Sequence, residues 1–205
     1  AVRRMRDLAL GVPTVLLGRK GLRAVRGDIT QVDVDVVVNA ANRNLRQGTG
    51  LSDALFKAAG PAEMRAACDK LGSCAPGHAV ITPGFRLPAQ YVVHAVGPIW
   101  VNGRQHESEL LASCYREALS LAAAQKARSI AFPLLSTGPY GYPREQAFRI
   151  AMTELAACAA GWTPAGELLL FMPAAQDDPE GELFRGIIDD SILEAIERLP
   201  PDFRD

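Results

Sequence analysis

Apolar and polar positions change along the chain in short blocks, and the first blocks have the spacing of β-strands. Residues 14–17 and 22–27 are rich in apolar residues and flank a glycine-containing turn, so each predicts a short strand. Residues 32–40 begin with alternation and then become continuously apolar, which is typical of a strand buried on both faces. We therefore expect the third strand to lie in the middle of a sheet.

After residue 51 the apolar residues recur at the spacing of an α-helix. This spacing runs from Ser52 to Lys70, and Gly60 followed by Pro61 predicts a break within it. Either Ser52 or Thr49 is available to cap the first turn, because a hydroxyl there can accept a hydrogen bond from a backbone N–H. The sequence thus predicts a broken helix that begins beside a glycine-containing loop.

The rest of the chain continues to alternate between the two patterns. Further strands are expected at residues 78–84, 90–98, 129–135 and 167–172, and further helices at residues 107–127, 144–160 and within 182–199. Pro143 suits the start of one helix and Gly161 its end. Strands that alternate with helices over the whole length predict an α/β sandwich with a largely parallel sheet.

Composition sets limits on the function without identifying it. The 205 residues suit a single domain, and no apolar run approaches the roughly 18 residues needed to cross a bilayer. The first residues lack the cleavage pattern of a signal peptide, so a cytoplasmic location without a membrane partner is expected. A formal net charge of -1 gives no basic surface for direct nucleic-acid binding. The four cysteines and three histidines have no metal-ligand spacing, so we expect neither a metal nor another cofactor.

Two glycine-containing loops follow expected strands and precede expected helices. In residues 48–50 two glycines let the backbone curl until several N–H groups converge, and the helix start directly after them favours an anion. Residues 136–141 have the same setting. Ligands of α/β sheets bind at the carboxyl ends of strands, so two such loops together imply a diphosphate. Taken singly, either loop is also compatible with an ordinary connection.

Standard nucleotide motifs do not explain these loops. The chain has no GxxxxGK[ST] motif, and the GxGxxG-like fragment at residues 48–53 begins too far from its strand for a dinucleotide-binding turn. Asp28 lies between two expected strands, where its carboxylate can accept a hydrogen bond from an exocyclic amine or act as a simple turn residue. His94 lies within an expected strand, and we interpret it as a core histidine.

Six sequence blocks occur in one order between roughly Leu22 and Met172. They read GDIT, VVVNAAN, AAGP, ITPGFRLPAQYVVHAVGP, ASCYREALSLA and SIAFPLLSTGPYGYP. In this order they resemble the macrodomain family, the module that binds ADP-ribose. The resemblance implies an α/β fold, a three-layer α/β/α macrodomain sandwich with a mixed, largely parallel sheet. It also implies a single macrodomain over residues 1–205, with a family-like core at about residues 22–172 and a C-terminal helical extension at residues 180–205.

The resemblance further implies a deep cleft that holds ADP-ribose. Asp28 and the N–H of Ile29 would hold the adenine, and Phe171 would either border it or be buried in the core. The diphosphate would be wrapped by a loop of five residues: Ser136, Thr137, Gly138, Pro139 and Tyr140. Asn42 would contact the distal ribose, while Asn39 would contact the ligand or, as we favour, brace the loop. The distal ribose and its phosphate would be covered by the backbone of four residues: Gly48, Thr49, Gly50 and Leu51.

The loop that carries the chemistry in hydrolytic relatives is altered in this chain. Such relatives typically have an Asp ten positions after the second Asn of the NAAN motif, and this chain has Ser52 there. Asp53 is a carboxylate displaced by one position, and Phe56 replaces a polar residue found in some active relatives. Pro139 has no N–H to offer a phosphate. We still expect hydrolysis, with Asn42 orienting the distal ribose and with Ser52 or Asp53 bonding a water that the ligand's own phosphate helps to activate.

The predicted function is therefore that of an enzyme, an ADP-ribosyl hydrolase. It would bind ADP-ribose and remove ADP-ribose from the acidic side chains of modified proteins, so its expected partners are ADP-ribose and ADP-ribosylated proteins. Ser52 and Phe56 favour one alternative, a non-catalytic reader of ADP-ribosylation. A second alternative is a hydrolase of small ADP-ribose esters such as O-acetyl-ADP-ribose, which would make the same contacts with the cleft.

Overall fold

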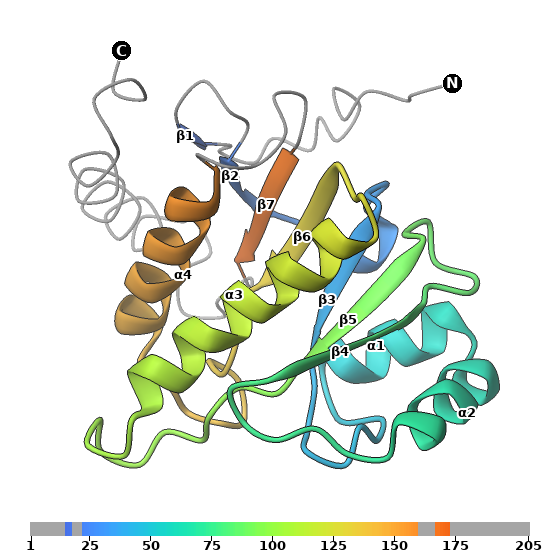
Figure 1. Ribbon diagram of the computed structural model, residues 1–205, viewed down its shortest axis with the longest axis horizontal. Helices are drawn as coiled ribbons and strands as arrows, with labels where there is room; N and C mark the ends of the chain where they lie inside the picture. The colour runs from blue at the N-terminus through green and yellow to red at the C-terminus, as the bar shows by residue number, and fades with distance from the viewer. Residues whose placement is uncertain (1–14, 18–21, 160–166, 173–205) are drawn as a thin grey trace.

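The structure is a computed structural model, and it describes residues 15–17, 22–159 and 167–172 of the chain. In this part of the chain a β-sheet forms the middle of three layers, with helices on both of its faces (Figure 1). The expected helix end at Gly161 and the expected C-terminal helical extension lie outside the described residues. The domain boundaries given above stay a prediction.

Seven strands form the sheet in the described residues, in the spatial order β1-β2-β7-β6-β3-β5-β4. Their bounds are Val15–Leu17 for β1, Leu22–Arg26 for β2, Val36–Ala40 for β3, Ala79–Pro83 for β4, Tyr91–Ala95 for β5, Ser129–Pro133 for β6 and Glu167–Met172 for β7. The inner strands, from β2 to β5 in this order, run parallel to one another, and β1 and β4 are antiparallel edge strands. The prediction of a mixed, largely parallel sheet is confirmed.

Two pairs of helices cover the two faces of the sheet in the described residues. They are α1 (Leu51–Ala59) and α2 (Pro61–Leu71) on one face and α3 (Glu107–Ala124) and α4 (Arg144–Ala159) on the other. In β3, Val36 and Val38 pack in the core under α3 and α4, while Val37 packs in the core under α1 and α2. The strand is thus buried on both faces, as its continuous apolar run predicts. Among the described helices, none has both the length and the apolar surface that a bilayer crossing needs.

The third strand is shorter than its sequence pattern indicates. β3 begins at Val36, and a short 3-10 helix, η2 (Ile29–Gln31), comes before it. Val32 and Val34 lie between these two elements and are buried in the core under α1 and α2. Their alternation therefore reflects an extended segment that packs against helices without joining the sheet.

The start of α1 also differs from the expectation. Its N-cap is Gly50, with φ +58, and no side chain caps the helix, so the prediction that Ser52 or Thr49 caps it is wrong. The first N–H groups of an α-helix have no acceptor within the helix, and here no described side chain caps them. The predicted break is confirmed, because Gly60, at φ +98, ends α1 and Pro61 begins α2.

Candidate ligand-binding cleft

A cavity of about 490 Å³ opens at the carboxyl ends of the parallel strands. Its lining includes residues 27–29 after β2, residues 40–42 at the end of β3, Gly97 after β5 and residues 133–140 at the end of β6. Residues 48–52, which lead into α1, complete it. Small-molecule sites typically enclose about 300–1,000 Å³, and in α/β sheets they lie at this edge. Size and position therefore both make this cavity the candidate ligand-binding site.

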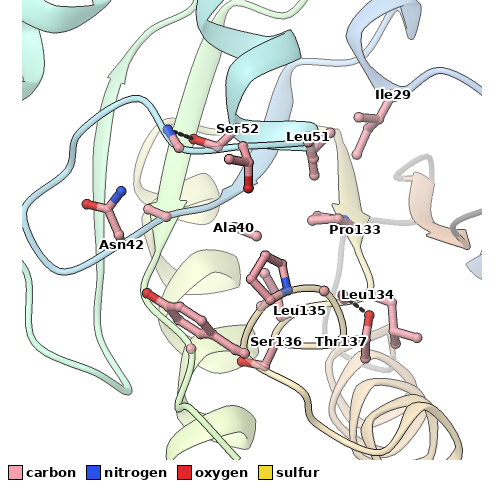
Figure 2. Close-up of a pocket in the computed structure, with 18 of the residues that line it drawn as sticks. Ile29, Ala40, Asn42, Leu51, Ser52, Pro133, Leu134, Leu135, Ser136 and Thr137 are labelled. Atoms are coloured by element: carbon pink, nitrogen blue, oxygen red, sulfur yellow. Dashed lines mark hydrogen bonds between the residues drawn. The ribbon is translucent and has the colours of Figure 1, made fainter.

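The cavity is a cleft between two loops that face each other across it (Figure 2). Leu51 and Ser52 lie on one side and Ser136 on the other, while Ile29 and Asn42 lie towards opposite ends. Three strand spacings separate the end of β2 from the end of β3, which is about 14 Å. The cleft is therefore shaped for an extended ligand.

The first loop, residues 42–50, is held in shape by Asn42. The Asn42 side chain donates from Nδ2 to the Arg46 carbonyl at 2.7 Å and accepts at Oδ1 from the Arg46 N–H at 3.1 Å. The Gly48 N–H donates to Ser52 Oγ at 3.3 Å, a bond drawn in Figure 2. Asn42 and Ser52 line the cleft, as do four predicted backbone contributors: Gly48, Thr49, Gly50 and Leu51. Asn42 thus closes the loop with its amide and also borders the ligand space.

The start of α1 presents backbone donors to the cleft. Leu51 and Ser52 are the first two residues of the helix, and both line the cleft. Because no side chain caps the helix, its first N–H groups and the positive end of its dipole lie uncapped at the edge of this space. An uncapped helix start in a cavity is suited to bind an anion.

The second loop, residues 136–142, is closed by its own backbone and supported by α3. The Tyr142 N–H donates to the Ser136 carbonyl at 3.0 Å. Tyr115 of α3 accepts at Oη from the Leu135 N–H at 3.2 Å, which fixes the end of the strand that enters the loop. The five residues that the sequence assigned to this loop all line the cleft: Ser136, Thr137, Gly138, Pro139 and Tyr140.

Ser136 is the most constrained residue of the second loop. It has φ +64, which is uncommon for a residue with a side chain, and it is only 7% exposed. Its Oγ has no hydrogen-bond partner among the described residues. Gly97 lies against it, and a Cβ added at Gly97 would be 2.1 Å from Ser136 Oγ. A residue with a side chain at position 97 would therefore displace the Ser136 hydroxyl.

Among the described residues, two charged side chains line the cleft, Asp28 and Arg144. Asp28 caps η2, because its Oδ1 accepts from the Thr30 N–H at 2.9 Å and from Thr30 Oγ1 at 2.7 Å. Both of these bonds end on Oδ1, and no described hydrogen bond ends on Oδ2. Arg144 is the first residue of α4, directly beyond the second loop. Arg144 is not among the residues predicted from the sequence, although a cation just after an anion-binding loop was a signal for it.

Asn39 lies behind the cleft and does not line it. It is buried, and its Nδ2 lies 3.2 Å from Nδ1 of His94, its partner on the neighbouring strand β5. Nε2 of His94 lies 2.9 Å from Thr82 Oγ1. Burial lowers the pKa of His94 to about 4, so the ring is neutral near pH 7. In this position Asn39 is suited to brace the strand end that leads to Asn42, and direct contact with a ligand stays a prediction.

Asp53 lies next to Ser52 in the sequence but does not line the cleft. Its Oδ2 lies 2.7 Å from Lys57 Nζ, and its Oδ1 accepts from Gln47 Nε2 at 2.8 Å. The hydrogen bond from Lys57, followed by that from Gln47, lowers the pKa of Asp53. The carboxylate is therefore engaged along its own helix and with the first loop. Phe171 pairs with Pro133 in the sheet, and its side chain lies outside the described residues.

Part of the lining is not among the site residues predicted from the sequence. The missed residues are Gly27, Ala40, Ala41, Gly97, Pro133, Leu134, Leu135 and Arg144. Except for Arg144 they are small or apolar residues at strand ends, and they carry no chemical signal of their own. They line the cleft because neighbouring strands end at the same edge of the sheet.

Thiol and metal chemistry find little support in the described residues. No group of three or more His, Cys, Asp or Glu side chains that could hold a metal ion occurs there. Burial raises the pKa of the Cys68 thiol to about 11 and that of the Cys114 thiol to about 12. Both thiols therefore stay protonated near pH 7 and are poor nucleophiles.

An α/β/α domain with an extended cleft between two loops that offer backbone N–H donors is typical of proteins that bind elongated, anionic small molecules. Comparison with known proteins then identifies the family. The family model described as Macro domain matches residues 38–151. The chain belongs to the macro domain family.

Relatives with known names or structures agree with this assignment. The O-acetyl-ADP-ribose deacetylase of Klebsiella pneumoniae is 45% identical over 168 residues, which cover 80% of this chain and 94% of that protein. The solved structure of the Oceanobacillus iheyensis macrodomain with ADP superposes with a TM-score of 0.78 at 33% identity, covering 92% of this chain and 98% of the other. The Trypanosoma brucei macrodomain in complex with ADP-ribose gives a TM-score of 0.69 at 36% identity, covering 78% and 66%. The predicted macrodomain fold is confirmed.

Proposed function

We propose that this chain binds ADP-ribose in the cleft and hydrolyses carboxylic esters of its distal ribose. The observation that carries the proposal is the order of groups along the cleft, with Ile29, which follows Asp28, at one end, two facing loops with backbone N–H donors in the middle and Asn42 at the other end. A base, a diphosphate and a second sugar would match this order. A structural relative was solved with ADP-ribose, and a sequence relative is named for deacetylating O-acetyl-ADP-ribose.

The adenine would bind beside η2. Asp28 Oδ2 would accept a hydrogen bond from the exocyclic amine, while Oδ1 keeps its bonds to Thr30. The Ile29 N–H would donate to a ring nitrogen of the same base. Because an amine donor and a ring acceptor are read together, this end of the cleft would favour adenine over bases with a carbonyl at that position.

The diphosphate would lie between the two loops. The uncapped start of α1 supplies N–H donors from one side, and the backbone of residues 136–140 supplies them from the other. Pro139 offers no N–H, so the second loop has one donor fewer than its length allows. The Arg144 guanidinium, which lines the cleft, would neutralise part of the charge.

Ester hydrolysis would require the protein mainly to position a water. The Gly48 N–H donates to Ser52 Oγ, so the Ser52 hydroxyl proton is free to bond the water or a phosphate oxygen. The water attacks the ester carbonyl and a phosphate oxygen of the ligand accepts a proton from it. The bond between the carbonyl carbon and the ribose oxygen then breaks, the ribose oxygen takes up a proton, and the free acid leaves.

The proposed substrates include ADP-ribose esters on acidic side chains of proteins as well as small esters. An acetyl ester and a glutamyl or aspartyl ester of ribose are the same functional group, so one water position would serve both. The modified protein would remain outside the cleft, while its ADP-ribose enters it. ADP-ribosylated proteins are therefore the proposed partners.

A non-catalytic reader is the second candidate, and the charge distribution of the cleft favours it. Among the described residues Asp28 is the only carboxylate in the lining, and it lies at the adenine end. Asp53 is bonded to Lys57, and Phe56 is buried in the core. No carboxylate of the described residues therefore faces the distal ribose as a general base.

A binding titration paired with a single-turnover assay separates these candidates. Calorimetry with ADP-ribose should show binding to the wild-type protein, and Asp28→Asn should weaken it about tenfold, because a hydrogen bond to a charged group contributes about 1.5–3 kcal/mol. Asp33→Asn, an exposed carboxylate nearby, is the matched control. Release of acid from O-acetyl-ADP-ribose and from a glutamate-linked conjugate then measures catalysis. Binding without release would establish the reader, and absence of binding would refute both candidates.

A further inference from the structure

A buried carboxylate organises the loop between β5 and α3. Glu107, the first residue of α3, is only 2% exposed. Its Oε1 accepts hydrogen bonds from the N–H groups of Val101 at 3.3 Å, Asn102 at 3.2 Å and Gly103 at 3.1 Å. Its Oε2 accepts from the Gln105 N–H at 2.5 Å. One side chain thus holds four backbone donors of a single loop.

This carboxylate is charged at neutral pH despite its burial. Burial by itself raises the pKa of Glu107, but the hydrogen bonds from its own N–H and from the N–H groups of Gln105, Asn102 and Gly103 outweigh it and lower the pKa to about 2. Several N–H groups that converge on one point form an anion-binding concavity. In this loop the concavity is filled by a side chain of the protein itself.

The loop held by Glu107 contacts the second loop of the cleft through Trp100. The backbone N–H of Trp100 donates to the backbone carbonyl of Tyr140 at 2.8 Å, and the ring centroids of Trp100 and Tyr142 are 4.7 Å apart. Gly103, at φ +75, lies under the Trp100 ring, where an added Cβ would be 2.8 Å from it. Glu107 fixes Gly103, Gly103 sets the place of Trp100, and Trp100 holds Tyr140, which lines the cleft.

We propose that Glu107 is a positioning residue for the diphosphate half of the cleft, acting through Trp100 on the carbonyl of Tyr140. The inference rests on the proposed function, because the contact of residues 136–140 with a diphosphate is itself proposed. It extends that function to a residue that touches no ligand and to a loop that has no other link with the chemistry.

The charge of Glu107, rather than its shape, is the property that matters. Glu107→Gln keeps the length of the side chain but replaces one acceptor oxygen by an NH₂ group, which would face an N–H donor. Either the Gln105 bond or the three bonds to Oε1 must then be lost. Glu109 offers a matched control in the same helix turn, because its side chain is 69% exposed and its described partners are local: its own N–H, the Ser108 hydroxyl and, at 3.9 Å, His106 Nδ1.

The test compares Glu107→Gln with Glu109→Gln in a Trp162→Phe background, which leaves Trp100 as the only tryptophan. Glu107→Gln should shift the Trp100 emission to longer wavelength without any ligand, and it should weaken ADP-ribose binding about tenfold by calorimetry. Binding of adenosine, which has no phosphate, should change less than twofold. A general loss of structure would weaken both ligands alike, so the contrast between them identifies a positioning effect.

The binding and emission measurements distinguish a failure of the proposed role of Glu107 from a failure of the proposed function. If the background protein binds ADP-ribose and both variants bind it equally well, the inference is wrong. If the background protein binds no ADP-ribose, the proposed function is wrong. If Glu107→Gln leaves the Trp100 emission unchanged, the proposed link between Glu107 and Trp100 is wrong, whatever the binding result. If circular dichroism shows that Glu107→Gln does not fold, Trp100→Ala in the natural sequence takes its place, and equal affinity of Trp100→Ala and wild type for ADP-ribose would overturn the inference.

Discussion

Gly97→Ala tests the packing that shapes the second loop. Gly97 is buried at the end of β5, lines the cleft and has no positive φ that would itself strain an alanine. The new Cβ would lie 2.1 Å from Ser136 Oγ, 3.4 Å from Ser136 Cβ and 3.8 Å from Ser136 N. A Cβ essentially never lies closer than 3.0 Å to another heavy atom, so Ser136 Oγ must move by about 0.9 Å or more.

The size of the effect follows from that displacement. A shift of about 0.9 Å breaks a hydrogen bond of ordinary length, and a bond to a charged group contributes about 1.5–3 kcal/mol. Affinity for ADP-ribose should therefore fall by about tenfold to a hundredfold. Overpacking of a buried site should also lower the free energy of unfolding by about 1–3 kcal/mol.

Removal of the opposing side chain should reverse the effect. Ser136→Gly deletes the Oγ that clashes, and glycine adopts φ +64 without strain. It also removes a buried hydroxyl that has no partner among the described residues. In the Ser136→Gly background, Gly97→Ala should therefore have little effect on either quantity.

Calorimetry with ADP-ribose and urea unfolding of the four proteins give the double-mutant cycle. We expect a coupling free energy of at least about 1 kcal/mol, as found for residues in direct contact. Additive effects of the two substitutions would refute the reasoning, since they would mean that the two residues do not compete for the same space. Wild-type affinity in Gly97→Ala would refute it as well.

Three further predictions concern the charged and polar groups around the cleft. Ser52→Ala should slow single-turnover hydrolysis about tenfold, whereas Asp53→Asn should leave the rate within about threefold, because Ser52 lines the cleft and Asp53 does not. Mass spectrometry of the products measures both rates. A larger effect of Asp53→Asn than of Ser52→Ala would contradict this prediction. Arg144→Gln should weaken ADP-ribose binding several-fold at low salt and less at high salt, with adenosine unaffected, and calorimetry at two salt concentrations checks it. Since burial lowers the folded-state pKa of His94 to about 4 from 6.5, the unfolded state binds the proton first as the pH falls. The free energy of unfolding should thus decrease by on the order of 3 kcal/mol from this group as the pH falls from 6.5 to about 4. An NMR titration of the folded protein in which His94 has its midpoint near pH 6.5 would disprove this prediction.

The sequence predicts the layers of this fold because the two kinds of element have different periods. The break between α1 and α2 can also be predicted, because Gly60 and Pro61 act on the local backbone. The start of β3 is not, because Val32 and Val34 alternate as strand residues do but pack against helices. A pattern records which residues are buried, and it does not record what covers them.

The candidate site divides along the same line. The two loops are recognisable because glycine and polar residues mark them in the sequence, and the structure brings both to one cleft. Gly97 is not recognisable, because its role depends on Ser136, a residue on a different strand end. The different surroundings of Asn39 and Asn42 also depend on partners elsewhere in the fold. Asn39 meets His94, 55 residues away in the chain, and no local pattern predicts that pairing.

The two loops that form the walls of the cleft are held in place by different contacts, so different substitutions should disturb each of them. The first loop closes on itself, through Asn42 and the backbone of Arg46. The second loop depends on α3, because Tyr115 holds its entry and Glu107 holds its far side through Trp100. Changes in α3 should therefore weaken the proposed binding of a diphosphate while the proposed water position beside Ser52 stays intact. Changes in the first loop should affect both, because this loop leads into the α1 start, where Leu51 and Ser52 line the cleft.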